Sequence, residues 1–416
     1  MIHITDKHHC CGCEACVQVC PRQCITFEED SEGFRYPLAD ETDCIECGLC
    51  EKVCPVQNPH KPGTAIHILA ARNKDEEELL ASSSGGLFIV IAQKVIKDGG
   101  VVFGAKFDSD WNVIHSYADT MEGVKAFMGS KYVQSRIGNT FSVAKDFLKA
   151  GRKVLFTGTS CQIAALKNFL RKDYDNLLTI DVICHGVPSP KVWRKYLEEI
   201  KGNAPGGVKN SVSSPLNPPI SERNALSSAG MMKIMGISFR DKRISWKKYS
   251  FALTLAKPSG DGKQNTVSLS HIHREDSYMR LFLSNLILRP SCYRCPAKGG
   301  RSLSDLTIAD YWGIEDAHPE FDDERGVGLL IVNSKRSESW IDWEKLSFIT
   351  TSLPDAVNSN FSYYKSVIPP EKRTQAFLLI NSGKSTEEVV KKLLRISILT
   401  GLKSKIKIIM KRILKG

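Results

Sequence analysis

The residues with the clearest chemistry are eight cysteines near the start of the chain, which form two copies of the pattern C-x2-C-x2-C-x3-C-P. The copies are Cys10, Cys13, Cys16, Cys20 and Pro21, then Cys44, Cys47, Cys50, Cys54 and Pro55. In this spacing the first three thiolates hold one 4Fe-4S cubane, whereas the fourth is carried by the following helix to the other cluster. The sequence therefore predicts two 4Fe-4S clusters with crossed ligands. We assign one to Cys10, Cys13, Cys16 and Cys54, and the other to Cys44, Cys47, Cys50 and Cys20.

Other uses of these cysteines fit the spacing less well. A structural zinc site closes with four ligands and has no use for a third C-x2 step or the Cys-Pro ending. Disulfides are not expected, because we find no signal peptide and the chain is long enough to form its own core. Cys11 and Cys24 fall outside the pattern, and we interpret both as ordinary buried or partly buried residues. Residues 1–60 resemble the bacterial two-cluster ferredoxins, which implies a small α+β ferredoxin-like domain.

Four further cysteines form a separate set. Cys161 and Cys184 each follow an expected strand, and Cys292 and Cys295 share one C-x2-C loop. Because neighbouring parallel strands present their carboxyl ends at the same edge of a sheet, Cys161 and Cys184 could meet there. The four cysteines could then hold a third 4Fe-4S cluster. Read separately, the first two would be core residues and the last two would be half of a zinc site.

The sequence around these four cysteines resembles the coenzyme F(420) hydrogenase/dehydrogenase beta-subunit family over residues 66–345. The stretches that carry the resemblance are Gly158–Gln162, Cys184–Pro188, Arg289–Cys295 and Ser304–Gly313. The resemblance implies a flavoprotein with one FAD and a 4Fe-4S cluster held by cysteines in these four positions. Ser160 stands where the family usually has proline, which leaves the ligand Cys161 in place.

The resemblance also implies an FAD site. A Ser/Gly run before an apolar helix offers free backbone N–H groups to a diphosphate, although such a run alone is more often a helix cap. The residues assigned to FAD are Ser84, Gly85, Gly86, Gly129, Ser130, Lys131, Tyr132, Asp305 and Asp310. Lys131 would balance a phosphate or the reduced flavin, and Tyr132 would stack; a lone Lys-Tyr pair is otherwise a surface pair. No catalytic residue is identified. His185 is a candidate proton relay, or alternatively a histidine that only supports the adjacent cysteine.

Apolar patterns from residue 66 onward alternate between strands and helices, which predicts an α/β domain with a mixed sheet and helices on both faces. A linker with two prolines, Asn58–Gly63, separates it from the ferredoxin domain. Strands are expected at Cys24–Glu28, Phe34–Leu38, Ile66–Ala71, Val101–Phe107, Val154–Thr157, Leu177–Ile183, Gly236–Phe239, Phe251–Ala256, Leu306–Tyr311 and Leu329–Asn333. Helices are expected at Leu87–Ile96, Phe141–Ala150, Gln162–Leu170, Tyr278–Leu288 and Glu338–Leu346.

Two further segments have distinctive composition. Residues 202–232 are rich in Gly, Pro, Ser and Asn, which predicts a mobile surface insertion. Residues 346–416 are expected to form a C-terminal helical region, with a capped helix starting at Ser385. That region ends in a basic amphipathic tail, which would suit an anionic membrane surface or an acidic partner. A docked helix with a solvated basic face is an equal alternative.

The whole chain of 416 residues has an ordinary composition, with 42% hydrophobic and 25% charged residues. No run of eighteen apolar residues exists, so we expect no membrane span. Fourteen cysteines without a secretion signal indicate a reducing cytosol, and we expect a cytoplasmic protein with the tail as its only candidate membrane contact. About half of the net charge of +11 lies in the last sixteen residues, so nucleic-acid binding is not expected.

These cofactors together predict an iron–sulfur flavoprotein oxidoreductase. A flavin exchanges two electrons as hydride and each cluster passes one, so the flavin splits electron pairs and the clusters carry the single electrons. The expected partners are an electron donor or acceptor protein and an organic hydride partner, either coenzyme F(420) or another small substrate, with polysaccharide biosynthesis as one context. Two alternatives stay open: a non-catalytic electron-transfer subunit of a larger redox complex, and a zinc-stabilised nucleic-acid-binding protein.

Overall fold

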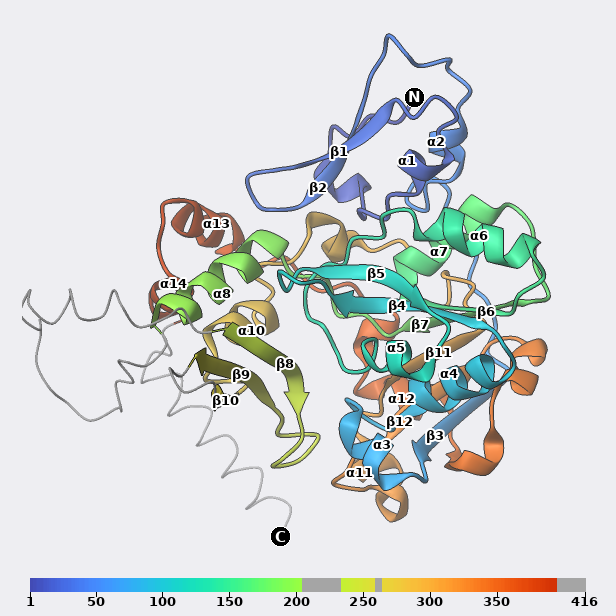
Figure 1. Ribbon diagram of the computed structural model, residues 1–416, viewed down its shortest axis with the longest axis vertical. Coiled ribbons are helices and arrows are strands. Elements are labelled where there is room, and N and C mark those ends of the chain that lie inside the picture. Colours follow the sequence, from blue (N-terminus) through green and yellow to red (C-terminus); the bar gives the residue numbers. More distant parts are fainter. Residues whose placement is uncertain (204–232, 259–263, 395–416) are drawn as a thin grey trace, which may run out of the picture.

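Eight strands form one mixed sheet in the computed structural model, which describes residues 1–203, 233–258 and 264–394 (Figure 1). Their order across the sheet is β13-β3-β12-β11-β7-β6-β4-β5. The pairings β11–β7, β7–β6 and β6–β4 are parallel and the other pairings are antiparallel. The strands are β3 (His67–Asn73), β4 (Val101–Phe107), β5 (Val113–Ala118), β6 (Val154–Thr159), β7 (Leu177–Val182), β11 (Leu306–Asp310), β12 (Gly328–Val332) and β13 (Leu346–Thr350).

Helices cover both faces of this sheet, because successive side chains of a strand point to opposite sides. Val102 of β4 is buried on the face covered by α4 (Leu87–Lys97). Its neighbour Phe103 is buried on the other face, among residues of α6 (Thr140–Lys149) and α7 (Ser160–Leu170). The predicted α/β class, with a mixed sheet between helices, is confirmed.

The remaining helices are shorter and connect or flank these layers. The α-helices are α1 (Ala15–Val19), α2 (Leu49–Lys52), α3 (Glu76–Ala81), α5 (Met121–Lys125), α8 (Pro190–Asn203), α10 (Ser277–Leu283), α11 (Ile314–Ala317), α12 (Leu353–Asn358), α13 (Arg373–Asn381) and α14 (Thr386–Leu393). The 3-10 helices are η1 (Lys7–His9), η3 (Pro290–Arg294), η4 (Pro319–Phe321), η5 (Lys335–Trp340), η6 (Trp343–Lys345) and η7 (Phe361–Tyr363). None of the helices in the described ranges combines the length and the apolar character that crossing a lipid bilayer requires.

A second, three-stranded antiparallel sheet has the order β10-β9-β8, with β8 (Lys233–Asp241), β9 (Ser250–Pro258) and β10 (Gln264–Ile272). It packs through an aromatic core on α8 and α10. The ring of Trp193 lies 5.1 Å from the ring of Phe239 and 5.1 Å from that of Tyr278, centroid to centroid. This sheet therefore shares one core with helices that come from both sides of it in sequence.

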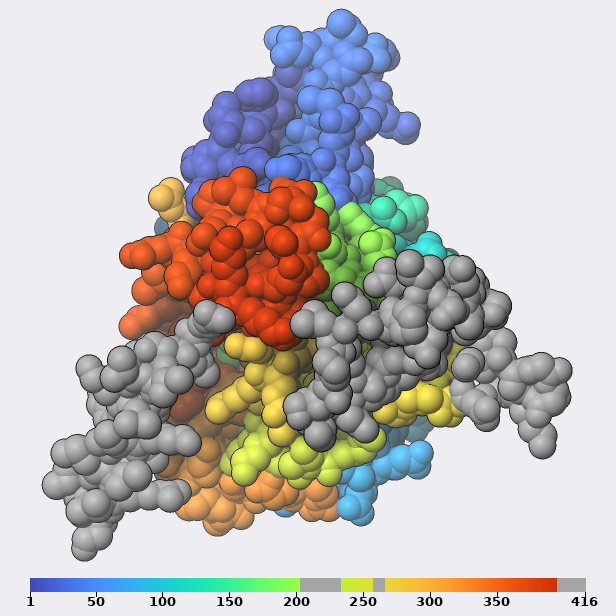
Figure 2. Space-filling model, turned by 90° about the vertical axis from the view of Figure 1, so that its left-hand side faces the viewer, coloured from blue at the N-terminus to red at the C-terminus, as the bar shows by residue number. Residues whose placement is uncertain are grey.

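The ferredoxin unit, residues 1–60, contains the hairpin β1 (Ile25–Glu29)–β2 (Arg35–Ala39) and the helices α1 and α2, which end just before the two Cys-Pro pairs. It forms a lobe at one end of the molecule, and the red C-terminal part of the described chain, which contains α13, lies near its base (Figure 2). Ala15 and Val53 of the unit are buried in the same core as Phe141 of α6. The side-chain oxygen of Gln18 also accepts a hydrogen bond from the backbone of Ser142, at 3.1 Å. The unit is therefore packed onto the α6–α7 face of the body.

Two predicted helices differ in the structure. The helix expected at Tyr278–Leu288 ends at Leu283, because Asn285 has a left-handed backbone with φ of 61°. The segment Glu338–Leu346 forms 3-10 turns that lead into strand β13, since Ile341 has an extended backbone. Strands β5, β10 and β13 were not predicted from the sequence. The insertion predicted at 202–232 lies almost wholly outside the described residues, as does the basic tail after residue 394.

Gly85 is held at a point where no side chain fits. A Cβ at this position would lie 2.4 Å from the carbonyl oxygen of Ala71 and 2.4 Å from the backbone nitrogen of Gly328, which are paired across β3 and β12. Because both obstacles are sheet backbone, we expect Gly85→Ala to lower the free energy of unfolding by about 3 kcal/mol. Urea denaturation of the cofactor-free protein measures this.

The matched control is Gly151→Ala. Gly151 lies in a turn and has a positive φ of 76°, and nothing lies within 4 Å of the point that its Cβ would occupy. Only backbone strain opposes the change there, at a cost of about 1 kcal/mol. Equal losses in the two variants would show that the close approach at Gly85 has no special weight.

Candidate functional site: cysteine sets and a central cavity

All fourteen cysteines are free thiols, and we group twelve of them into three sets according to the ligand sets predicted from the sequence. We call Cys10, Cys13, Cys16 and Cys54 the first set, Cys20, Cys44, Cys47 and Cys50 the second set, and Cys161, Cys184, Cys292 and Cys295 the internal set. Across the described residues, no three His, Cys, Asp or Glu side chains lie close enough to hold a single metal ion.

The second set surrounds a small cavity at the outer end of the ferredoxin unit. All four of its cysteines line that cavity, although Cys20 belongs to the other sequence repeat. Backbone N–H groups point at two of the sulfurs: Ile2 donates to Cys50 at 3.3 Å and Glu46 donates to Cys44 at 3.4 Å. Hydrogen bonds of this kind adjust the potential of a cluster. Cys47 is exposed, so this set lies at the surface.

Three cysteines of the first set are buried and Cys54 is half-buried; Cys10 and Cys13 lie where the ferredoxin unit meets the body. Burial raises the pKa of the Cys16 thiol, and the charges of Cys10 and Cys54 raise it further. Burial likewise raises the pKa of Cys54, with a further contribution from Cys10. Cys54 therefore lies within electrostatic reach of Cys10, Cys13 and Cys16, and also of Cys50 of the second set, so the crossed assignment stays a prediction.

The internal set gathers at the carboxyl ends of two parallel strands. Cys161 follows β6 and Cys184 follows β7, and these strands are hydrogen-bonded neighbours. Cys292 lies in η3, where its sulfur accepts a hydrogen bond from the backbone of Val187 at 3.4 Å. Burial raises the pKa of Cys292, and the charges of Cys184, Cys295 and Cys161 raise it further. The four thiols are therefore within electrostatic reach of one another.

Cys11 connects the first set with the internal set. Contact with the thiol of Cys13, together with burial, raises the pKa of Cys11 well above its usual value, and Cys161 contacts the same thiol. The expectation from the sequence was an ordinary buried or partly buried cysteine. Cys11 is buried, but its place between a cysteine of each set was not foreseen.

A central cavity of about 650 Å³ lies at the carboxyl ends of the parallel strands. Its wall includes Cys184 of the internal set and its neighbour His185. Eight of the nine residues assigned to FAD also line it: Ser84, Gly85, Gly86, Gly129, Ser130, Lys131, Tyr132 and Asp310. Clefts at this edge of an open α/β sheet are where ligands usually bind.

The two sequence motifs assigned to FAD meet directly. The backbone nitrogen of Ser130 donates to the hydroxyl of Ser83 at 2.8 Å, and the two hydroxyls lie 2.9 Å apart. Helix α4 begins after Gly86, whose φ is 72° and which makes no side-chain cap. The first N–H groups of α4 therefore have no side-chain acceptor from the N-cap residue and begin at the cavity wall.

Lys131 is half-buried in this wall, and its ammonium has only backbone carbonyl partners among the described residues. Its ammonium donates to the carbonyl oxygens of Met128 at 2.9 Å, Gly129 at 3.1 Å and Phe127 at 3.3 Å. Burial lowers the pKa of Lys131 to about 7. The loop thus holds a cation whose charge is easily lost unless an anion stabilises it.

Two family models match parts of this chain. Residues 9–58 match a family model described as a 4Fe-4S dicluster domain, and residues 151–355 match the model for the C terminus of the coenzyme F(420) hydrogenase/dehydrogenase beta subunit. Residues 151–355 belong to the coenzyme F(420) hydrogenase/dehydrogenase beta-subunit family. The chain also carries an N-terminal ferredoxin domain and is an iron–sulfur electron-transfer protein.

A chain of the F(420)-reducing NiFe hydrogenase complex from Methanosarcina barkeri is similar in structure. The identity is 16% and the TM-score is 0.40, over 81% of this chain and 95% of the other. A likeness at that score supports no argument about function. No curated protein matches the sequence significantly.

Within the segment that matches the beta-subunit family, Asp305 does not reach the cavity. It precedes β11, whereas Asp310 ends the same strand, and only the carboxyl end of β11 meets the cavity. One oxygen of Asp305 accepts bonds from Thr179, at 2.9 Å and 2.7 Å, and the other accepts one from Arg336, at 2.9 Å. The expectation that Asp305 contacts FAD is therefore corrected: its carboxylate ties strands and a 3-10 turn together at the opposite edge.

Asp310 lines the cavity through a pair that no sequence pattern indicated. The guanidinium of Arg240, on β8, donates to Asp310 at 2.6 Å and to the hydroxyl of Tyr132 at 3.3 Å. It also lies over the rings of Tyr249 at 4.1 Å and Trp312 at 5.3 Å. Arg240 comes from the second sheet, so no local pattern could have pointed to it.

Two histidines also line the cavity. The Nε2 of His185 lies 2.6 Å from the side-chain oxygen of Asn285. His115 bonds through Nε2 to the carbonyl oxygen of Thr157 at 3.0 Å, and burial lowers its pKa to about 4. The Nδ1 of His115 is buried without a partner in the described chain, and so is the Nε of Arg240.

Proposed function

We propose that this protein is an iron–sulfur flavoprotein oxidoreductase, in which FAD occupies the central cavity and the internal set holds a third 4Fe-4S cluster. One observation carries the proposal: Cys184 of the internal set lines the same cavity as the Ser84–Gly86 and Gly129–Tyr132 motifs. A flavin bound there would lie against a ligand of the cluster. Such adjacency is what the passage of single electrons between the two groups needs.

The residues of the cavity fit a flavin dinucleotide. The cavity volume of about 650 Å³ is in the ordinary range for cofactor sites. The start of α4 offers backbone N–H groups to a diphosphate, and the Lys131 ammonium is available to balance its charge. The unpartnered Nδ1 of His115 and Nε of Arg240 at the wall are further polar atoms for which the described chain supplies no partner.

The internal set fits an iron–sulfur cluster by its donor chemistry. It consists of four free thiols on three separate segments, without histidine or carboxylate among them. Thiolates are the ligands that Fe–S clusters use, although a zinc site with four cysteine ligands would use the same atoms. Cys11 supports the cluster interpretation, because it bridges this set and the first set and so gives a short path between them.

When bound, FAD would exchange hydride with an organic partner and the clusters would carry single electrons. The chain itself positions these groups: Lys131 and α4 orient the dinucleotide, and Cys11 closes the gap to the ferredoxin unit. The exposed Cys47 places the second set where an external redox protein could meet it. The hydride partner would be coenzyme F(420), as the family description suggests, or another small substrate.

Anaerobic reduction trials test this function. Purified protein is mixed in turn with reduced coenzyme F(420) and with NAD(P)H while flavin absorbance and cluster EPR are followed. We expect one hydride donor to bleach the flavin and then to give reduced-cluster signals. Bound FAD that dithionite reduces, but that no hydride donor reduces, would instead indicate a non-catalytic electron-transfer subunit.

The affinity for FAD should depend on pH through Lys131. Because its pKa in the folded protein is about 7, Lys131 is mostly charged below pH 7 and mostly neutral above it. An anionic diphosphate binds the charged form, so the association constant should fall by up to about tenfold per pH unit as the pH rises above 7.

Two neighbouring groups should not contribute to this pH dependence. His115, with a pKa of about 4, stays neutral, and Arg240 stays charged because Asp310 raises its pKa against the effect of burial. Titration of apoprotein with FAD between pH 6 and pH 9 measures the dependence. A similar slope in Lys131→Met would contradict the assignment to Lys131.

A further inference from the structure

Arg289 is a buried cation whose side-chain partners among the described residues include no carboxylate. Arg289 is 0% exposed, and its guanidinium lies where the ferredoxin unit meets the body. Burying a charge without an opposite charge is costly, and natural proteins rarely do so unless something compensates it. A cluster at the first set could supply that compensation.

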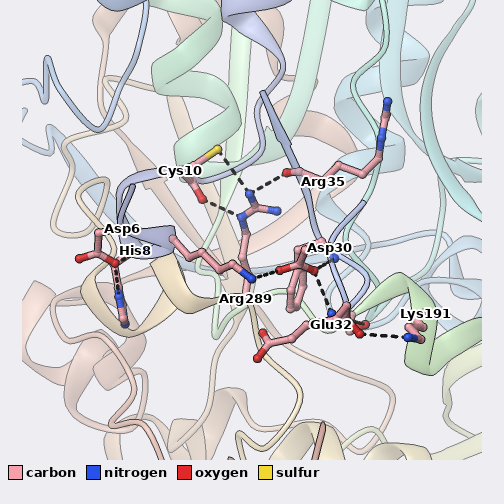
Figure 3. A network of polar contacts seen from close by, with 12 residues as sticks. Asp6, His8, Cys10, Asp30, Glu32, Arg35, Lys191 and Arg289 are labelled. Atoms are coloured by element: carbon pink, nitrogen blue, oxygen red, sulfur yellow. Dashed lines mark hydrogen bonds and ion pairs between the residues drawn. The ribbon is translucent and has the colours of Figure 1, made fainter. Parts of the chain in front are cut away.

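Figure 3 shows the guanidinium directed at Cys10 of the first set. The Nε donates to the carbonyl oxygen of Cys10 at 2.7 Å, and Nη2 lies 3.4 Å from its sulfur. The remaining bonds go to neutral oxygens: the side chain of Gln134 at 3.1 Å and the carbonyl of Arg35 at 2.9 Å. Among these partners, the cysteine sulfur alone can carry a negative charge, when it is ionised.

The surrounding groups of the described chain add no carboxylate. The rings of Tyr36 and Phe34 lie 4.4 Å and 5.5 Å from the guanidinium. Although burial opposes ionisation, the charges of Cys10, Tyr36, Cys11 and Cys292 raise the pKa of Arg289. Gly12 makes room for the side chain, because a Cβ there would lie 2.8 Å from Nη1. The fold therefore places this cation in contact with one cysteine of the first set.

We propose that Arg289 is the counter-charge of the cluster at the first set and raises the reduction potential of that cluster. This inference rests on the proposed function, since it requires a cluster at those cysteines. Reduction adds one negative charge to a buried site, which burial disfavours and a neighbouring cation favours. Net charge and hydrogen bonds to sulfur are among the factors that set cluster potentials. Arg289 supplies a positive charge beside Cys10 and a hydrogen bond to its sulfur.

The test is an EPR-monitored redox titration of the anaerobically purified full chain. The reduction step that belongs to the cluster at the first set is identified because it is lost in the Cys54→Ser variant. We expect Arg289→Gln to lower the ratio of reduced to oxidised cluster about tenfold at a fixed potential, a shift of about 59 mV for a one-electron couple. Arg289→Lys keeps the charge and should move the ratio less than threefold.

A second variant keeps the guanidinium in place. Gln134→Glu puts a carboxylate beside Nη1 and should lower the ratio in the same direction as Arg289→Gln. This variant decides the question alone where Arg289→Gln does not fold. The matched control is Arg373→Gln: Arg373 sits at the same boundary but is paired with Glu32 at 2.8 Å, and its hydrogen-bond partners are oxygens. In Arg373→Gln we expect the ratio of reduced to oxidised cluster at the first set to stay within twofold of the wild-type ratio.

An unmoved wave in both Arg289→Gln and Gln134→Glu would overturn the role of Arg289, as would an equal shift in Arg289→Lys. These results leave the proposed function intact, because they are read from a cluster that is present. A wild-type protein without any reduced-cluster signal would overturn the proposed function and this inference together.

Discussion

Cys292→Ala is expected to lower the iron content from about twelve to about eight atoms per chain, because only the internal set loses a ligand. The same change should stop electrons passing between the flavin and the ferredoxin unit. Cys184, another member of this set, lines the central cavity, and Cys161 contacts Cys11 on the proposed path to the first set. Iron analysis and stopped-flow absorbance after anaerobic reduction of the flavin measure both effects.

Cys24→Ala is the control for this experiment. Cys24 is a buried free thiol beside the second set, with its sulfur 3.5 Å from that of Cys20, but it belongs to none of the three sets. It should keep about twelve irons. A Cys292→Ala protein with unchanged iron content would show that the internal set holds no cluster.

Lys131→Met is expected to weaken FAD binding about 100-fold while the iron content stays constant. Removing one partner of a buried charge pair typically costs about 2–5 kcal/mol, and the Lys131 ammonium is held in the cavity wall by three carbonyl oxygens. Equilibrium titration of apoprotein with FAD, followed by flavin fluorescence, gives the dissociation constant.

Lys125→Met is the matched control, since Lys125 is an exposed lysine of the same segment that pairs with Glu122 at 3.2 Å. Its effect on FAD binding should stay below about twofold, as for other exposed ion pairs. Equal losses of FAD affinity in the two lysine variants would mean that FAD does not bind next to Lys131.

The parts of the site that were predictable follow from spacing along the chain and from strand direction. The Cys-Pro repeats indicated that Cys20 and Cys54 change places. In the structure Cys20 lines one cavity with Cys44, Cys47 and Cys50, and the charge of Cys10 acts on Cys54. The parallel neighbours β6 and β7 brought Cys161 and Cys184 to one edge of the sheet, as the strand pattern implied.

Strand direction could also have separated Asp305 from Asp310. The two residues stand at opposite ends of β11, about 16 Å apart at the usual rise per residue, and only one end faces the cavity. The motif suggested both because they lie in one short stretch of sequence. The direction of the strand, which placed the cysteines correctly, was the available signal.

Other residues of the site could not be predicted, because they come from distant parts of the chain. Arg240 reaches Asp310 from the second sheet, and Arg289 reaches Cys10 across the boundary between the ferredoxin unit and the body. The contact of Cys11 with the internal set depends on α7, which places Cys161 next to it. Tertiary packing, which leaves no local pattern, determines all three contacts.

The most direct test of the account is the cofactor content of the anaerobically purified chain. Iron, zinc and acid-extracted flavin are determined together, and the visible spectrum is recorded. We expect about twelve irons and one FAD per chain, with absorption near 400 nm that dithionite bleaches. A chain with about eight irons and no flavin, or with zinc in place of iron, would contradict a circuit of three clusters and a flavin.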